Sequence, residues 1–229
     1  MADNNSAMAA LFSPSLVIFD CDGVLVDTEP VANRLLVRLL GDVGYEVTYE
    51  ECRRLFVGRS LEAVVAHVEA ALGRSLGAHW PDMIREESLK AFAQGEVQAV
   101  PGVEGLVRSL RIAQLPYCVA SSGRLEKMRF TLGASGLLPL MADALFSAQM
   151  VGRGKPAPDL FLHAAREMGH EPASCLVIED SVPGVQAAVA AGMPVIGYAG
   201  DPHTDAAGLE REGAHVVSDM SALARLIGV

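Results

Sequence analysis

Four short runs of apolar residues, rich in β-branched side chains, divide the chain, and each ends in a polar cluster. These runs cover residues 16–19, 117–120, 175–178 and 194–198, and a weaker fifth candidate covers residues 144–146. The stretches between them repeat apolar residues at a helical spacing; one of them, 182–191, is followed by a glycine, as helices commonly are. Buried strands that alternate with amphipathic helices are typical of a parallel sheet covered on both faces. The sequence therefore predicts a doubly wound α/β fold, with its chemistry beyond the carboxyl ends of the strands.

Residues 30–96 interrupt this alternation, because they carry helical stripes of apolar residues and no convincing strand. We expect this segment to form a small helical lobe inserted after the first strand, with residues 15–29 and 97–229 as the α/β core. Residues 1–14 are expected to be a flexible tail. A simple extension of the core by these helices is the alternative.

Composition excludes several classes of function. The formal net charge is −10, from 18 Lys and Arg against 28 Asp and Glu, so the chain lacks the clustered cations that grip nucleic acid or an anionic membrane. The four cysteines show no CxxC spacing, which argues against structural zinc and a disulfide framework. No basic leader and no apolar run of about 20 residues is present. We expect a cytoplasmic protein, monomeric in the first instance, with a dimer left open.

Acidic residues follow two of the predicted strands. Asp20 and Asp22 come directly after the first strand, and Glu179 and Asp180 end the strand at 175–178. An EF-hand loop would need its glycine at the sixth position, whereas Gly23 is at the fourth. If the two strands are neighbours, four carboxyl groups converge, and without compensation they would take up protons. A hard divalent cation resolves this repulsion, and Mg²⁺ favours a few carboxylates together with a phosphate oxygen.

Two further segments would complete a phosphate site. Ser121 and Ser122 follow the second strand just before a helix. They offer hydroxyls and backbone N–H groups at the positive N-terminus of that helix. Lys155 lies in a loop that two prolines stiffen. Each signal is weak alone, since a serine before a helix is usually a cap and a lysine usually lies on the surface.

A different phosphatase chemistry also fits one segment. Cys118 and Arg124 have the Cys-x5-Arg spacing of cysteine phosphatases, in which a thiolate attacks phosphorus and an arginine clamps its oxygens. Cys118 lies within the apolar run rather than at its end, so we expect it to pack in the core.

The four segments DCDGVLVDTE, VASSGR, GKPAPD and IEDSVPGVQAAVAAGM resemble, in order and spacing, the four motifs of the haloacid dehalogenase (HAD) superfamily. The resemblance spans residues 16 to about 200 and is closest to the phosphosugar phosphatase and β-phosphoglucomutase-like branch. It implies a Rossmann-like core, and the helical insertion looks like the cap of that family.

The resemblance implies a role for each matching residue. Asp20 would be the nucleophile that forms an aspartyl-phosphate, and Asp22 would protonate the leaving alcohol and then activate water. Ser121, with Ser122 beside it, and Lys155 would hold the transferred phosphoryl group. The cofactor would be Mg²⁺, held by the Asp20 carboxylate, the backbone carbonyl of Asp22, Asp180 and, as a further ligand, Glu179.

Within the family, three residues favour a hydrolase over a phosphosugar mutase. Mutases of this branch carry a histidine where this chain has Ala32, and basic residues in the cap loop where it has Val57 and Leu61. We expect hydrolysis of a small phosphorylated metabolite, a sugar or polyol phosphate by resemblance. A mutase and a non-catalytic protein that binds a phosphorylated metabolite remain the alternatives.

The substrate's leaving group is expected to be recognised outside these motifs. The cap loop residues Gly58, Arg59 and Ser60 are the candidates, together with Arg124 beside the serine pair. His203 follows the last predicted strand, and its role stays open.

Overall fold

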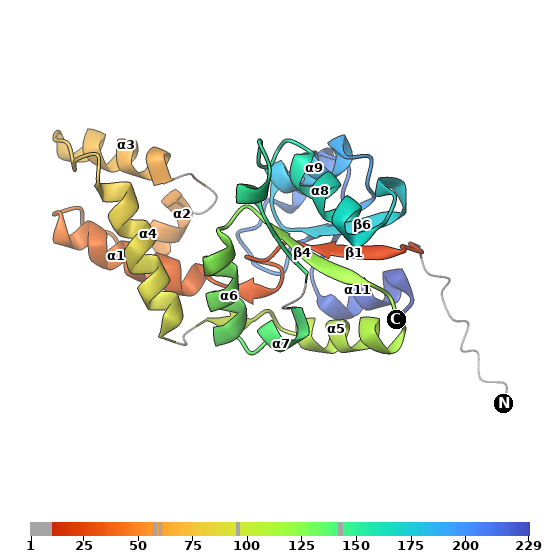
Figure 1. Cartoon of the computed structure of the whole chain (residues 1–229). Helices are drawn as coiled ribbons and strands as arrows, with labels where there is room; N and C mark the ends of the chain where they lie inside the picture. The colour runs from red at the N-terminus through yellow and green to blue at the C-terminus, as the bar shows by residue number, and fades with distance from the viewer. Residues whose placement is uncertain (1–10, 57–58, 60, 95–96, 142–143) are drawn as a thin grey trace, which may run out of the picture.

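The computed structural model of the chain describes residues 11–56, 59, 61–94, 97–141 and 144–229. A six-stranded sheet lies at its centre with the strand order β5-β4-β1-β6-β7-β8, and every neighbouring pair is parallel. The predicted doubly wound α/β fold is therefore confirmed (Figure 1). The strands are β1 (Leu16–Phe19), β4 (Tyr117–Ser121), β5 (Leu145–Ser147), β6 (Cys175–Glu179), β7 (Val195–Tyr198) and β8 (His215–Val217).

Helices cover both faces of this sheet. Side chains of β1 alternate between two buried clusters, with Val17 and Phe19 in one and Leu16 and Ile18 in the other. Both faces are apolar because both are covered, which is why the strand reads as a continuous apolar run. The first face carries α5 (Val103–Ile112), α6 (Leu125–Ala134), α7 (Leu138–Met141) and α11 (Met220–Ile227), and the second carries α8 (Asp159–Met168), α9 (Val182–Ala190) and α10 (Ala206–Arg211).

The order of the strands decides where a site can form. From β1 the chain proceeds to β4 and β5 on one side of the sheet, then returns to β6, β7 and β8 on the other. Phe19 pairs with Val119 of β4 and with Ile178 of β6, so the ends of these three strands lie at one edge. This reversal is the topological switch point at which α/β proteins bind ligands.

Four helices form a separate lobe beside the sheet, at the left of Figure 1. Among the described residues of 30–94 there is no strand, as predicted. Two short antiparallel strands, β2 (Val26–Asp27) and β3 (Gln98–Ala99), lie where the chain leaves and re-enters the core. We call this unit the helical lobe; its helices are α1 (Glu29–Asp42), α2 (Tyr49–Phe56), α3 (Leu61–Leu72) and α4 (Trp80–Ala93).

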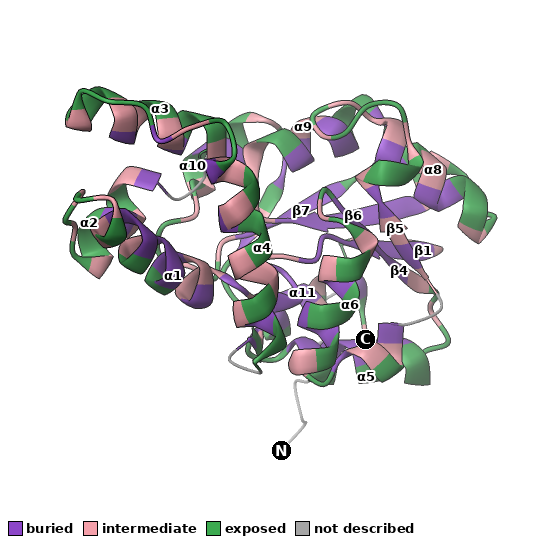
Figure 2. Cartoon of the chain, turned by 60° about the vertical axis from the view of Figure 1, so that its left-hand side comes forward, coloured by how far each residue is buried: buried purple, intermediate pink, exposed green. Residues whose placement is uncertain are grey.

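The helical lobe has its own apolar core. Leu40, Cys52, Val68 and Trp80 are buried within it, and Figure 2 shows buried residues turned inward on its helices. None of the described helices is long and apolar enough to cross a bilayer.

Candidate active site

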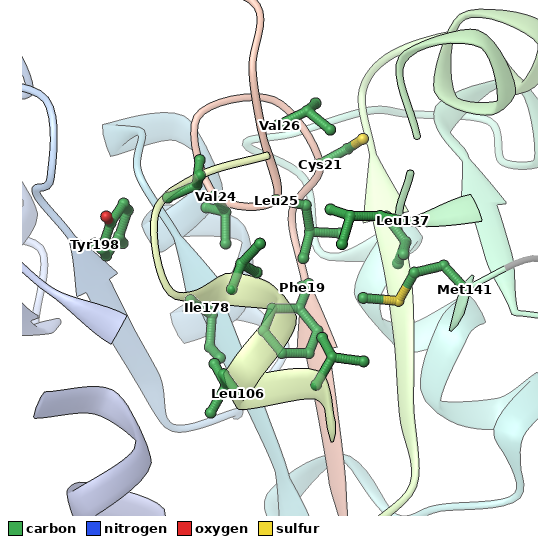
Figure 3. Packing of buried hydrophobic residues seen from close by; sticks show 14 of the residues in the cluster. Phe19, Cys21, Val24, Leu25, Val26, Leu106, Leu137, Met141, Ile178 and Tyr198 are labelled. Carbon is green, nitrogen blue, oxygen red and sulfur yellow. The ribbon is translucent and has the colours of Figure 1, made fainter. Parts of the chain in front are cut away.

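Buried apolar side chains anchor the loop after β1 in the core. Cys21, Val24 and Leu25 are fully buried in the core under the sheet's edge (Figure 3). The backbone amide of Asp20 donates to the carbonyl of Ile178 at 2.9 Å, which ties the loop to β6. With Cys21 fixed in the core between them, Asp20 and Asp22 line the cavity described below.

Three carboxylates gather at the ends of β1 and β6. Asp20, Glu179 and Asp180 each offer an oxygen, and these oxygens lie within 4.8 Å of one another. Burial raises the pKa of Asp20 to about 7, with the neighbouring acids adding to the rise and Lys155 opposing it. Burial, together with the charges of Glu179 and Asp20, raises the pKa of Asp180 well above its usual range. The predicted convergence is thus observed for these three residues, and their oxygens suit a hard divalent cation such as Mg²⁺.

Lys155 lies between two of these acids. Its Nζ is 2.5 Å from Oδ1 of Asp20 and 2.8 Å from Oε1 of Glu179, and only 4% of its side chain is exposed. Burial acts to lower the pKa of Lys155, but the two carboxylates outweigh it and raise the pKa, so the ammonium stays charged. A buried cation beside Asp20 is well placed to hold an anionic group that approaches this carboxylate.

Glu179 and two glycines shape the cluster. The second oxygen of Glu179 accepts hydrogen bonds from the backbone amide and hydroxyl of Ser181, at the start of α9. A Cβ on Gly23 would lie 1.9 Å from Oδ2 of Asp180, and one on Gly184 would lie 1.7 Å from Oε1 of Glu179. Both carboxylates can occupy their positions only because these residues are glycines.

Ser121 and Ser122 lie at the end of β4, next to the same cluster. Ser121 is buried, and its Oγ accepts a hydrogen bond from the backbone amide of Gly123 at 3.0 Å. Helix α6 starts only at Leu125, with Arg124 as its N-cap. Ser121 is therefore the last residue of β4 and Ser122 lies in the loop that precedes the helix, so neither serine is its cap.

Asp22 faces different partners from the other three acids. Its Oδ1 accepts a hydrogen bond from Thr28 Oγ1 at 2.9 Å, and its Oδ2 accepts one from Lys127 Nζ at 2.9 Å. Burial acts to lower the pKa of Lys127, but Asp22 outweighs it and raises the pKa. Sequence reasoning missed Lys127 and Thr28. One signal was available, since the chain has only three lysines and Lys127 follows the serine pair by five residues.

A cavity of about 880 Å³ collects most of the predicted residues. Its lining also includes polar residues from the loop after β7, among them Asp201, His203 and Thr204. Thus His203 borders the site, and its backbone amide donates to Asp201 Oδ1 at 2.7 Å. The predicted residues that line the cavity are Asp20, Asp22, Ser121, Ser122, Lys155, Glu179 and Asp180.

Of the residues predicted to recognise the leaving group, the structure describes two, and it does not bring them into the cavity. Arg59 and Arg124 are exposed, and neither contributes to the described lining. Gly58 and Ser60 lie outside the residues that the structure describes.

The cysteine phosphatase alternative does not fit the geometry. Cys118 lies inside β4 with 1% of its surface exposed, and it is absent from the described lining of the cavity. Burial raises the pKa of its thiol, which disfavours the thiolate that such a nucleophile requires. Its expected place in the core is confirmed.

Comparison with known proteins agrees with the motifs. A model of the haloacid dehalogenase-like hydrolase family matches residues 14–192. The 6-phosphogluconate phosphatase of Escherichia coli (strain K12) is 32% identical over 187 residues, 82% of this chain and 83% of that protein. Hexitol phosphatase A of the same strain is 31% identical over 179 residues, 78% and 80% of the two chains. The crystal structure of a HAD family hydrolase from Deinococcus radiodurans R1, with bound phosphate and sodium, has a TM-score of 0.81 and 32% identity and covers 96% of each chain.

A parallel sheet with acids at its switch point, together with these matches, defines the class. The chain belongs to the haloacid dehalogenase-like hydrolase family. It is a phosphatase, and its relatives include phosphatases of sugar acids and hexitols. The resemblance seen in the four motifs is confirmed.

Proposed function

We propose that the enzyme is a Mg²⁺-dependent phosphomonoester hydrolase that works through an aspartyl-phosphate on Asp20. The observation that carries this proposal is the position of Asp20, whose carboxylate belongs to the three-acid cluster and contacts the buried ammonium of Lys155. The proposed nucleophile, a positive charge and the candidate metal site would then all contact the same phosphoryl group of the substrate.

In the first step an oxygen of Asp20 attacks phosphorus and the ester P–O bond breaks. Asp22 gives its proton to the departing alcohol oxygen, and Lys155 and Ser121 stabilise the charge on the phosphoryl oxygens. In the second step water attacks the phosphorus of the aspartyl-phosphate and Asp22 takes the proton, which releases phosphate and restores Asp20. A bound Mg²⁺ would supply neutralisation of charge on the phosphoryl group.

The residues that would hold Mg²⁺ are those of the cluster. Carboxylate oxygens of Asp20 and Asp180 are the inferred ligands, with the Asp22 carbonyl and Glu179 as further donors. Glu179 accepts hydrogen bonds from Lys155 and Ser181, so beyond any metal contact it would hold the Lys155 ammonium and the start of α9 in place.

We further propose that residues 30–96, which contain the helical lobe, are a cap over the cavity, with residues 15–29 and 97–229 as the catalytic core. Of the tail expected over residues 1–14, residues 1–10 lie outside the described part of the chain, whereas Phe12 packs against the core and its backbone amide donates to the carbonyl of Leu226 at 3.0 Å. Arg53 of α2 supports this role, because its Nη2 lies 2.9 Å and 2.6 Å from the two oxygens of Asp201 on the cavity wall. A cap in this position would exclude water and contact the leaving alcohol. Gly58, Arg59 and Ser60 remain the proposed contacts from the cap, and Arg124 from the core.

The substrate that we propose is a small sugar or polyol phosphate, by analogy with the 6-phosphogluconate and hexitol phosphatases. Ala32, where mutases of this branch carry a histidine, and Val57 and Leu61, where they carry basic residues, favour hydrolysis over mutase chemistry. Val57 lies outside the residues that the structure describes. All four cysteines are buried and unpaired, in keeping with a reducing compartment, so we propose a cytoplasmic enzyme. We propose a monomer in the first instance, with a dimer left open.

Hydrolysis of p-nitrophenyl phosphate and of a panel of sugar and polyol phosphates, with Mg²⁺ or with a chelator, tests the proposal. We expect phosphate release that needs Mg²⁺ and that disappears in Asp20→Asn, whose circular dichroism spectrum stays unchanged. Metal-independent turnover, or full activity of the folded Asp20→Asn variant, would refute it. Tight binding of a phosphorylated metabolite without any turnover would instead favour the non-catalytic alternative.

A further inference from the structure

Asp22 is held by two donors from different parts of the chain. Thr28, six residues along the same loop, donates to Oδ1, and Lys127, from the first turn of α6, donates to Oδ2. Each distance is 2.9 Å, and 31% of the Asp22 side chain is exposed. A carboxylate on a loop can rotate about its side-chain bonds, but two donors on opposite oxygens fix the plane of its carboxyl group.

Lys127 is itself held in place. Its Nζ lies 5.4 Å from the ring centroid of Phe92 in α4, a cation–π contact. One turn later in α6, Thr131 is fully buried, and its hydroxyl donates to the backbone carbonyl of Lys127 at 3.1 Å. The lysine is therefore a fixed support rather than a mobile surface group, although its side chain is 28% exposed.

The two lysines of the site have separate partners. Lys155 contacts Asp20 and Glu179, whereas Lys127 contacts Asp22. Asp22 lines the cavity, but Lys127 does not belong to its described lining. Because Lys127 does not line the cavity, it can act on a bound substrate only through Asp22, which lies between Lys127 and the cavity.

We propose that Lys127 is a positioning residue: together with Thr28 it fixes the Asp22 carboxylate for proton transfer to the leaving alcohol and from water. This inference rests on the proposed function, in which Asp22 performs both proton transfers. A carboxylate has about four lone-pair sites, so two remain free for the reacting oxygen while the supporting donors stay bound.

The test compares Lys127→Met, which removes the charge at similar length, with Lys127→Arg, which keeps it. Lys90→Met is the matched control, because Lys90 is an exposed lysine paired with Glu87 on the helical lobe. For an alkyl phosphate that the wild type hydrolyses, we expect Lys127→Met to lower kcat about ten- to a hundredfold with KM changed less than about twofold. Lys127→Arg should recover most of this loss, and Lys90→Met should match the wild type.

A double-mutant cycle separates positioning from direct substrate binding. The rate of phosphoenzyme formation from p-nitrophenyl phosphate is measured in single turnover for Asp22→Asn, with and without Lys127→Met. Because p-nitrophenolate leaves with little need for a proton, this step should survive Asp22→Asn, and adding Lys127→Met should change it less than about twofold. A further loss of about tenfold, or a large rise in KM for Lys127→Met alone, would overturn the inference.

Failure of this inference and failure of the proposed function give different results. Unchanged kcat for a folded Lys127→Met in an active wild-type background overturns the inference alone. A wild-type enzyme that hydrolyses no phosphomonoester in the presence of Mg²⁺ overturns the proposed function and the inference with it. Thermal melts of all variants identify a lysine change that acts only through stability.

Discussion

At the scale of single residues, the chemistry of Asp20 is set by its neighbours. Burial and two nearby acids oppose its negative charge, while Lys155 at 2.5 Å favours it, and the balance leaves its pKa at about 7. A divalent cation among the three carboxylates adds the missing positive charge. We therefore expect the site to prefer the metal-bound state.

That preference predicts a pH-dependent stabilisation by Mg²⁺. Between about pH 4 and pH 7 the folded state holds a proton on Asp20 that the unfolded state has lost, so the metal-free protein loses stability as the pH rises through this window. Mg²⁺ competes with that proton. At one fixed concentration, about a hundredfold above its Kd at pH 8, Mg²⁺ should raise Tm by roughly 5 °C or more at pH 8. The same concentration should raise Tm by much less at pH 5.5. Equal shifts at both pH values, or a full shift in Asp180→Asn, would contradict this.

Gly23 offers a second test at the same scale. Its φ is +81°, and an added Cβ would meet Asp180, whereas Gly44 has a φ of +85° with nothing within 4 Å. Both Gly23→Ala and Gly44→Ala should lose roughly 1–2 kcal/mol from backbone strain, measured by chemical denaturation. Only Gly23→Ala should also weaken Mg²⁺ binding and lower kcat/KM, by about tenfold or more, because it displaces Asp180. If both variants lose activity equally, the clash is not the cause.

The acids of the site could be predicted from the sequence, but the hydrogen bonds from Thr28 and Lys127 that hold Asp22 could not. Asp20 and Asp180 could be predicted because each follows an apolar strand directly, and parallel strands end at one edge. The bond from Lys127 to Asp22 joins residues 105 apart in the chain, and no local pattern reports how α6 is placed against the first loop.

At the scale of elements, the long buried strands could be predicted, and β5 only as a weak candidate, whereas β8, β2 and β3 were missed. β1, β4 and β6 are apolar on both faces, so their runs are continuous. β8 has only three residues, of which His215 is exposed, and β2 and β3 have two residues each. Strands this short leave too little pattern to recognise.

At the scale of elements, the testable prediction concerns Cys118 in the interior of β4. Because Cys118 is buried within the strand, Cys118→Ala should leave kcat within about twofold and cost roughly 1 kcal/mol of unfolding free energy. Iodoacetamide should not inactivate the native enzyme, whereas a chelator should. Loss of turnover in Cys118→Ala, or rapid inactivation on alkylation, would revive the thiolate mechanism.

At the scale of the whole molecule, the helical lobe and the core meet beside the cavity. Arg53 of α2 and Asp201, after β7, form an ion pair whose side chains are 14% and 36% exposed. These residues are 148 positions apart. Nothing in their local sequence marks them as partners, although the lobe itself was visible as an interval of helical stripes.

This ion pair predicts how the lobe affects substrate binding. Arg53→Met should raise KM about three- to tenfold while lowering Tm little, since a partly exposed pair contributes about 1 kcal/mol or less. Roughly 0.5 M salt should produce part of the same rise in the wild type by screening. Arg85→Met is the control, because Arg85 pairs with Asp82 and Glu62 on the lobe alone. An unchanged KM in Arg53→Met, or an equal rise in Arg85→Met, would contradict this part of the account.

The central claim is that Asp20 attacks phosphorus beside a divalent cation held by the acids of β1 and β6. A crystal structure of the enzyme with Mg²⁺ and beryllium trifluoride, which mimics a phosphoryl group on a carboxylate, tests it most directly. We expect beryllium bonded to a carboxylate oxygen of Asp20, contacts from Lys155 and Ser121 to the fluorides, and Mg²⁺ bound by Asp20 and Asp180. Beryllium fluoride on another side chain, or Asp20 and Asp180 with no cation between them, would contradict it.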